Sequence, residues 1–153
     1  MDAALQQIDN LTEKPYPLVY FETLREPHVV DLFKSLSLVC SKAIYHWTPM
    51  NGMYRMDASH ILIPRTQEPH HLLESILSTP HFGVYLLSGF EENLKDYRSM
   101  NLIKKIISDY KNTQRMVIML GNNIEIPLEL RTSVAHIRHQ VKPTTATASR
   151  RVS

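Results

Sequence analysis

Apolar residues gather along this chain in short continuous runs, separated by longer stretches in which they recur every three or four positions. The short runs are rich in β-branched and aromatic residues, as is typical of buried strands. The longer stretches have the spacing of amphipathic helices. The pattern therefore predicts strands over residues 18–21, 44–47, 84–87, 116–120 and 134–137.

Four helices are predicted between these strands. The first begins near Glu26, where Pro27 suits an initial turn. The second has Thr66 as its expected N-cap and Pro69 in its first turn. The third spans residues 93–112 without a break, and the fourth is a short turn over 127–131. Residues 53–65 fit a short strand, a helical turn or an apolar loop.

Strands that alternate with helices and are apolar throughout indicate a mostly parallel sheet covered on both faces. We therefore expect a three-layer, doubly wound α/β fold with about five strands. Residues 1–13 are expected to be a polar leader or a fraying helix, and residues 14–141 the α/β domain. Residues 142–153 contain Lys, Pro, Thr, Ala, Ser and Arg with little to bury, and predict a disordered tail.

Composition narrows the classes of function. Seventeen Lys and Arg against fifteen Asp and Glu give a net charge of +2, too small to indicate a nucleic-acid partner. No apolar run is long enough to predict membrane insertion, and the first ten residues do not resemble a signal peptide, so a cytoplasmic location is expected. Cys40 is the single cysteine, which excludes an intramolecular disulfide.

A nucleotide-binding domain of this fold needs a glycine-rich loop after its first strand, because close approach to phosphate requires glycine. The four glycines are Gly52, Gly83, Gly89 and Gly121, and none lies between the first strand and the first helix. The sequence there is Glu-Thr-Leu-Arg-Glu-Pro. We therefore expect no nucleotide hydrolysis and no cofactor.

Other chemistry is weakly indicated. Eight histidines are scattered over the chain without metal-binding spacing, so no metal site is predicted. A small-molecule or nucleotide sensor could use the strand ends at Ser88-Gly89 and residues 121–123. An unrecognised metal-dependent hydrolase could use Glu22, Glu91 or Glu92 as acids. These two hypotheses remain alternatives to a role without catalysis.

Methionine and aromatic residues cluster around the turn that follows the second predicted strand. Such residues either form core beneath a loop or provide an adaptable protein-binding surface. If they are core, polar substitution should collapse stability rather than binding. The candidate contact residues are Trp47, Met50, Met53, Tyr54 and Met56.

Several segments together resemble one known domain. They are residues 15–20, 45–48, 85–90 and 117–120, and above all Ile-Glu-Ile-Pro-Leu-Glu-Leu at 124–130. They resemble the N-terminal, non-catalytic domain that precedes the ATPase module in AAA-type ATPases related to a chloroplast-encoded protein. The likeness covers about residues 14–141. It implies a degenerate P-loop or Rossmann-like fold used for interaction, here standing alone without an ATPase module.

The combined interpretation is a non-catalytic protein-interaction module. It would act as an adaptor, an assembly subunit or a regulator, with an AAA-type ATPase or another multi-subunit machine as its partner. An exposed edge strand, the first or the last, could also pair with a partner strand or with a second copy to form a homo-oligomer.

Overall fold

A computed structural model describes residues 2–58 and 61–139. The five predicted strands are present, and the observed elements follow the predicted alternation. The helices and strands are α1 (Ala3–Thr12), β1 (Leu18–Glu22), α2 (Glu26–Val39), β2 (Ile44–Thr48), β3 (Gly52–Arg55), α3 (Pro69–Ser78), β4 (Gly83–Ser88), α4 (Tyr97–Ser108), β5 (Arg115–Gly121) and β6 (Val134–Arg138). Short 3-10 turns are η1 (Met56–Ala58), η2 (Glu91–Lys95), η3 (Asp109–Lys111) and η4 (Leu128–Leu130).

The strands form one sheet in the order β3-β2-β4-β5-β1-β6. Neighbours from β2 to β6 pair in parallel, and β3 alone runs antiparallel to β2. The α/β class and the mostly parallel sheet are confirmed, with one strand more than expected. That strand, β3, is only four residues long, too short to produce a clear alternating pattern.

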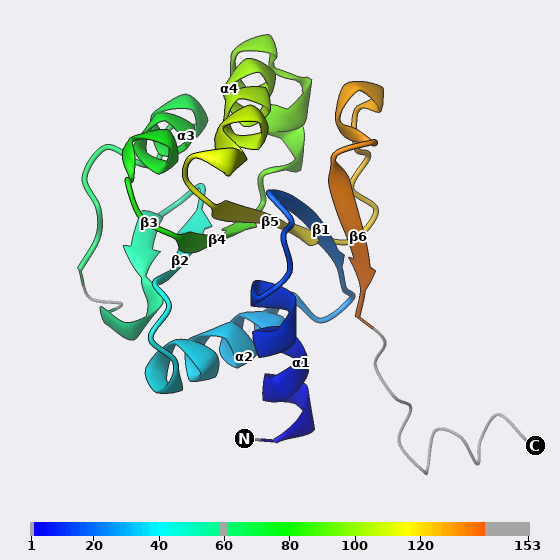
Figure 1. The fold of residues 1–153 in the computed structure, drawn as a ribbon. Coiled ribbons are helices and arrows are strands. Elements are labelled where there is room, and N and C mark those ends of the chain that lie inside the picture. The colour runs from blue at the N-terminus through cyan, green and yellow to red at the C-terminus, as the bar shows by residue number, and fades with distance from the viewer. Residues whose placement is uncertain (1, 59–60, 140–153) are drawn as a thin grey trace, which may run out of the picture.

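Helices cover both faces of the sheet, which makes three layers (Figure 1). One apolar cluster joins α1 and α2 to the sheet through side chains such as Phe33 and Ile118. The other joins α3 and α4 to the opposite face through side chains such as Leu73 and Ile103. β4 and β5 contribute to both clusters, since alternate side chains of a strand point to opposite faces. Their continuously apolar sequences follow from this double burial.

Of the two alternatives expected for residues 1–13, a polar leader or a helix, the structure has the helix. Most of this segment forms α1, which begins at the N-cap Asp2 and packs along α2. Its Ile8 and Leu11 are buried in the cluster beneath the sheet. Two apolar side chains one turn apart give a helix only a narrow buried stripe, so a sequence with so few apolar residues looks solvated.

Two helix boundaries also differ from expectation. The predicted helix over 93–112 is broken, because Asp96 is extended and its carboxylate accepts the N–H of Ser99 to begin α4. Tyr97, the first residue of α4, is 79% exposed. Thr66 is not the N-cap of α3, whose N-cap is Glu68. Thr66 is buried and bonds to the edge of the sheet instead.

Among the described residues the outer strands of the sheet are β3 and β6, and a bridge between Leu62 and Tyr54 partly covers β3. The first strand is therefore not an edge, since β1 lies between β5 and β6. The last strand is an edge, as expected. The predicted tail over 142–153 lies outside the described residues.

Candidate functional site

Ligands of open parallel sheets bind beyond the carboxyl ends of the strands, where the chain connections diverge. The connection after β1 runs over the α2 face toward β2, and the connection after β5 runs over the opposite face toward β6. The divergence therefore lies between the ends of β1 and β5, at Glu22 and Gly121. A phosphate group would be expected at this position in a nucleotide-binding relative.

Part of the backbone of the loop after β1 is not available to a phosphate. The N–H of Thr23 donates to the carbonyl of Gly121 at 2.9 Å and so extends the sheet. The N–H of Arg25 donates to Thr23 Oγ1 at 3.0 Å. Pro27 has no N–H group. Three of the positions that would cradle an anion are thus already bonded or have no donor.

A carboxylate and an apolar side chain lie beside the end of β5. Glu26 begins α2, and its Oε1 would lie 3.8 Å from a Cβ placed on Gly121, which puts the carboxylate beside the end of β5. Burial and repulsion from Glu91 raise the pKa of Glu26. The Ile124 side chain would lie 2.7 Å from that same Cβ. A nucleotide phosphate would meet negative charge and a filled space there.

The acids of the hydrolase hypothesis do not form a joint site. Glu22 accepts hydrogen bonds from His136 at 2.7 Å and from Arg138 at 3.3 Å, and the His136 bond is the main cause of the lowered pKa of Glu22. Glu91 and Glu92 are exposed on η2, and Glu92 pairs with Lys95 at 3.6 Å. Within the described residues, no three His, Cys, Asp or Glu side chains are placed to hold one metal ion.

Most of the predicted contact cluster is core. Trp47, Met53 and Met56 are buried, so they cannot contact a partner while the sheet edge is folded. Tyr54 is half-buried, and its hydroxyl bonds to His46 at 2.7 Å. Met50 alone is 83% exposed, at the turn between β2 and β3. The contact surface predicted from these residues is therefore wrong for the three buried side chains.

The sequence pattern did not predict the polar cluster that the structure forms around the buried His46. His46 Nε2 bonds to Ser88 Oγ at 2.9 Å, and its Nδ1 bonds to the Tyr54 hydroxyl. Burial lowers the pKa of His46 to about 4, so the ring is neutral at pH 7. The three residues are brought together by the pairing of β2 with both β3 and β4, which no local spacing could reveal.

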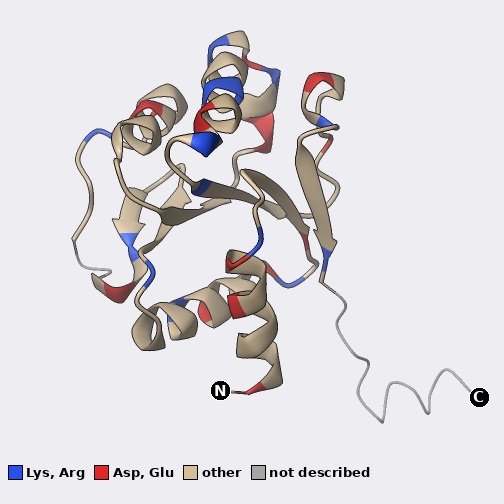
Figure 2. Cartoon of the chain, viewed as in Figure 1, with Lys and Arg blue, Asp and Glu red and all other residues tan. Residues whose placement is uncertain are grey.

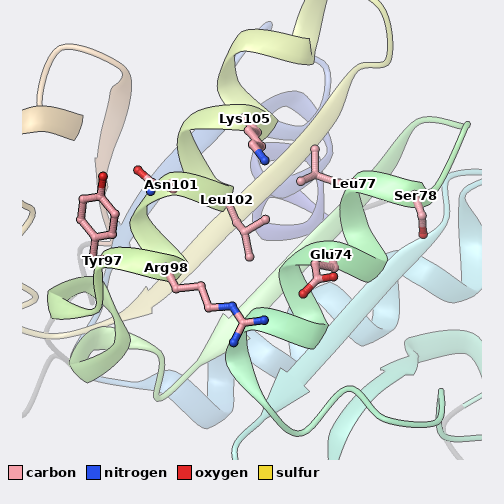
Figure 3. A pocket seen from close by; sticks show the side chains of 8 residues that line it. All are labelled: Glu74, Leu77, Ser78, Tyr97, Arg98, Asn101, Leu102 and Lys105. Carbon is pink, nitrogen blue, oxygen red and sulfur yellow. The ribbon is translucent and has the colours of Figure 1, made fainter.

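A shallow groove of about 680 Å³ lies between α3 and α4 (Figure 3). Half-buried Leu77 and Leu102 line it, and the exposed Tyr97 stands at one end. Figure 3 shows Arg98 reaching from α4 toward α3, which carries Glu74. Tyrosine and arginine beside apolar side chains are the residue types that dominate binding energy at protein interfaces.

The fold is a three-layer α/β domain with a mostly parallel sheet, and no glycine-rich loop follows its first strand. Residues 4–139 match the family described as the SpoVK-like AAA ATPase, N-terminal domain, and the chain belongs to this family. The expected resemblance is thereby confirmed.

A curated relative is similar at the sequence level. It is the protein named "Uncharacterized AAA domain-containing protein ycf46" of Trieres chinensis, 25% identical over 123 residues. The match covers 78% of this chain and 24% of that protein, so the chain spans about a quarter of the length of this relative. No helix among the described residues is long and apolar enough to cross a membrane.

Proposed function

We propose that this chain is a protein-interaction module of the AAA ATPase system, without nucleotide chemistry of its own. The observation that supports this most strongly is the end of β5, where Ile124 and the Glu26 carboxylate lie against Gly121 and a glycine-rich loop is absent. A domain of this fold that binds no phosphate would act by binding other proteins through its surface. Its partner would be an AAA ATPase module, in the same polypeptide or in another, or a protein that such an ATPase handles.

The groove between α3 and α4 is the surface we assign to that contact. Its apolar floor is partly open, and Tyr97 exposes most of its ring to solvent. Within the described residues, Arg98 forms no salt bridge. A bound partner would cover Tyr97 and desolvate Arg98, and both changes favour a specific interface.

The test has two arms. Calorimetric titration with Mg-ATP and Mg-ADP should give no saturable heat up to millimolar nucleotide, because phosphate is excluded from the crevice. Saturable binding of either nucleotide would overturn the proposal and favour the nucleotide-sensor alternative.

The second arm measures partner capture. Tagged protein isolated from its host at moderate salt should retain a stoichiometric partner, and Tyr97→Ala should lose it. Lys111→Ala serves as the matched control, since Lys111 is exposed but lies outside the groove. Absence of any stoichiometric partner, or equal capture by all three proteins, would contradict the assignment.

A further inference from the structure

A second groove, larger than the first, lies on the opposite side of the sheet. It has a volume of about 860 Å³ and is bounded by α1, α2 and the edge strand β6. Its size falls in the range of binding pockets in proteins. Apolar side chains from four elements lie along it: Ile8, Leu11, Phe21, Leu32 and Ile137.

Three cations line this groove, and within the described residues only Arg138 has an acidic partner, Glu22 of β1. Lys14 and Arg25 flank the two ends of β1, and Arg138 ends β6; all three line the groove and are exposed. No Asp or Glu lines it. Figure 2 shows the corresponding blue segments on the chain entering β1, in the loop before α2 and at the end of β6. Lys14 and Arg25 form no salt bridge within the described residues.

The groove runs beside unpaired backbone. In the described part of the chain β6 pairs with β1 only. The N–H of His139 donates to the carbonyl of Glu22 on β1 at 2.8 Å. Since successive N–H groups of a strand point to opposite sides, those of His136 and Arg138 point to the outer edge. An extended segment laid along β6 would find these donors together with an apolar groove.

We propose that an extended, acidic segment of a partner protein adds as a strand at the outer edge of β6. Side chains on one face of the added strand would lie over the groove beside Ile137, where carboxylates among them would meet Lys14 and Arg25. The proposal rests on the proposed function in one respect, that the chain is an interaction module. The proposal adds a second binding surface, the groove beside β6, and states that its ligand is an acidic extended segment.

Two other occupants fit the charge poorly. A second copy paired edge to edge through β6 would bring a groove with the same cations to this edge, and like charges oppose pairing. The remaining residues of this chain, 140–153, contain Lys142, Arg150 and Arg151 and no acid. They carry the same sign as the groove, so charge complementarity favours a separate, acidic partner.

The test uses a fluorescein-labelled peptide in which valine and glutamate alternate, with a peptide of alternating valine and lysine for comparison. Fluorescence anisotropy with the full chain should show saturable binding of the acidic peptide only. The variant Lys14→Glu/Arg25→Glu should bind it at least about ten-fold more weakly. Lys34→Glu is the matched control, because Lys34 is exposed on α2 but does not line the groove.

Hydrogen exchange identifies the mode of binding. Bound acidic peptide should slow exchange at the amides of His136 and Arg138, which a ligand lying elsewhere would not do. Equal binding of the two peptides, equal loss in Lys34→Glu, or unchanged exchange at these amides would overturn the proposal. Self-association that Arg25→Glu abolishes would assign the groove to a second copy and overturn it also. Capture that depends on Tyr97 is unaffected by any of these results, so the two proposals fail separately.

Discussion

At the scale of single residues, His46 shows how burial changes the chemistry of a side chain. Both ring nitrogens are bonded, one to Tyr54 and one to Ser88, so the neutral ring has its hydrogen bonds satisfied. Protonation would place a charge inside the layer between the sheet and α2, and this is why burial lowers the pKa of His46 to about 4. The free energy of unfolding must then depend on pH.

The sign follows from the order of the two pKa values. Below pH 6.5 His46 is protonated in the unfolded chain, whereas in the folded chain it stays neutral down to about pH 4. Stability should therefore fall as the pH drops from 6.5 to 4, by about 2 kcal/mol between pH 7 and pH 5. Urea unfolding at the two pH values measures this, and His46→Gln should lose that part of the difference. His71→Gln, which removes an exposed histidine, should keep it; an unchanged difference in His46→Gln would refute the assignment.

At the scale of elements, the β2–β3 hairpin is held to the loop before α3 by a small set of buried bonds. The indole N–H of Trp47 donates to the carbonyl of Thr66 at 2.6 Å. The N–H of Met53 donates to Thr66 Oγ1 at 2.8 Å, and that hydroxyl donates to the carbonyl of Ile63 at 2.8 Å. The hydroxyl that local sequence assigns to a helix N-cap is used instead to hold an edge strand.

Trp47→Ala should therefore destabilise the protein by about 3–5 kcal/mol, since it opens a cavity against Phe90 and leaves the Thr66 carbonyl without its donor. Met50→Ala, in the same hairpin but exposed, should change stability by less than about 0.5 kcal/mol. Urea denaturation compares the two variants. Equal effects would mean that the hairpin does not pack as described.

At the scale of the whole molecule, both faces of the sheet need their helices. Ile8 and Leu11 of α1 join the same buried cluster as Phe33 of α2 and Phe21 of β1. The segment that composition marks as a polar leader is therefore part of the cooperative unit. The family match begins at residue 4, which agrees with this boundary.

Leu11→Ala should lower the free energy of unfolding by about 2–3 kcal/mol, as expected for a large-to-small change in a core. Leu38→Ala provides the comparison, because Leu38 is exposed on α2 and its truncation should be nearly neutral. Chemical denaturation followed by circular dichroism reports both. A neutral Leu11→Ala would restore the interpretation of residues 1–13 as a leader.

The sequence by itself determined the α/β class, the parallel strands and the absence of a glycine-rich loop. These follow from local causes: apolar runs such as residues 116–120 must be buried on both faces, and glycine is either present after a strand or not. Its resemblance to an AAA-associated domain was also readable, since residues 124–130 stand together in the chain.

Only the tertiary structure decided where chemistry and surfaces lie. Glu91 raises the pKa of Glu26, and His46 bonds to Ser88, because the sheet order brings together residues far apart in sequence. Trp47 is part of the core and not of a contact surface, because β3 pairs with its strand and Thr66 accepts its indole N–H. The groove beside β6 combines α1, α2 and the last strand. Such features arise from long-range packing, for which a one-dimensional pattern carries no local signal.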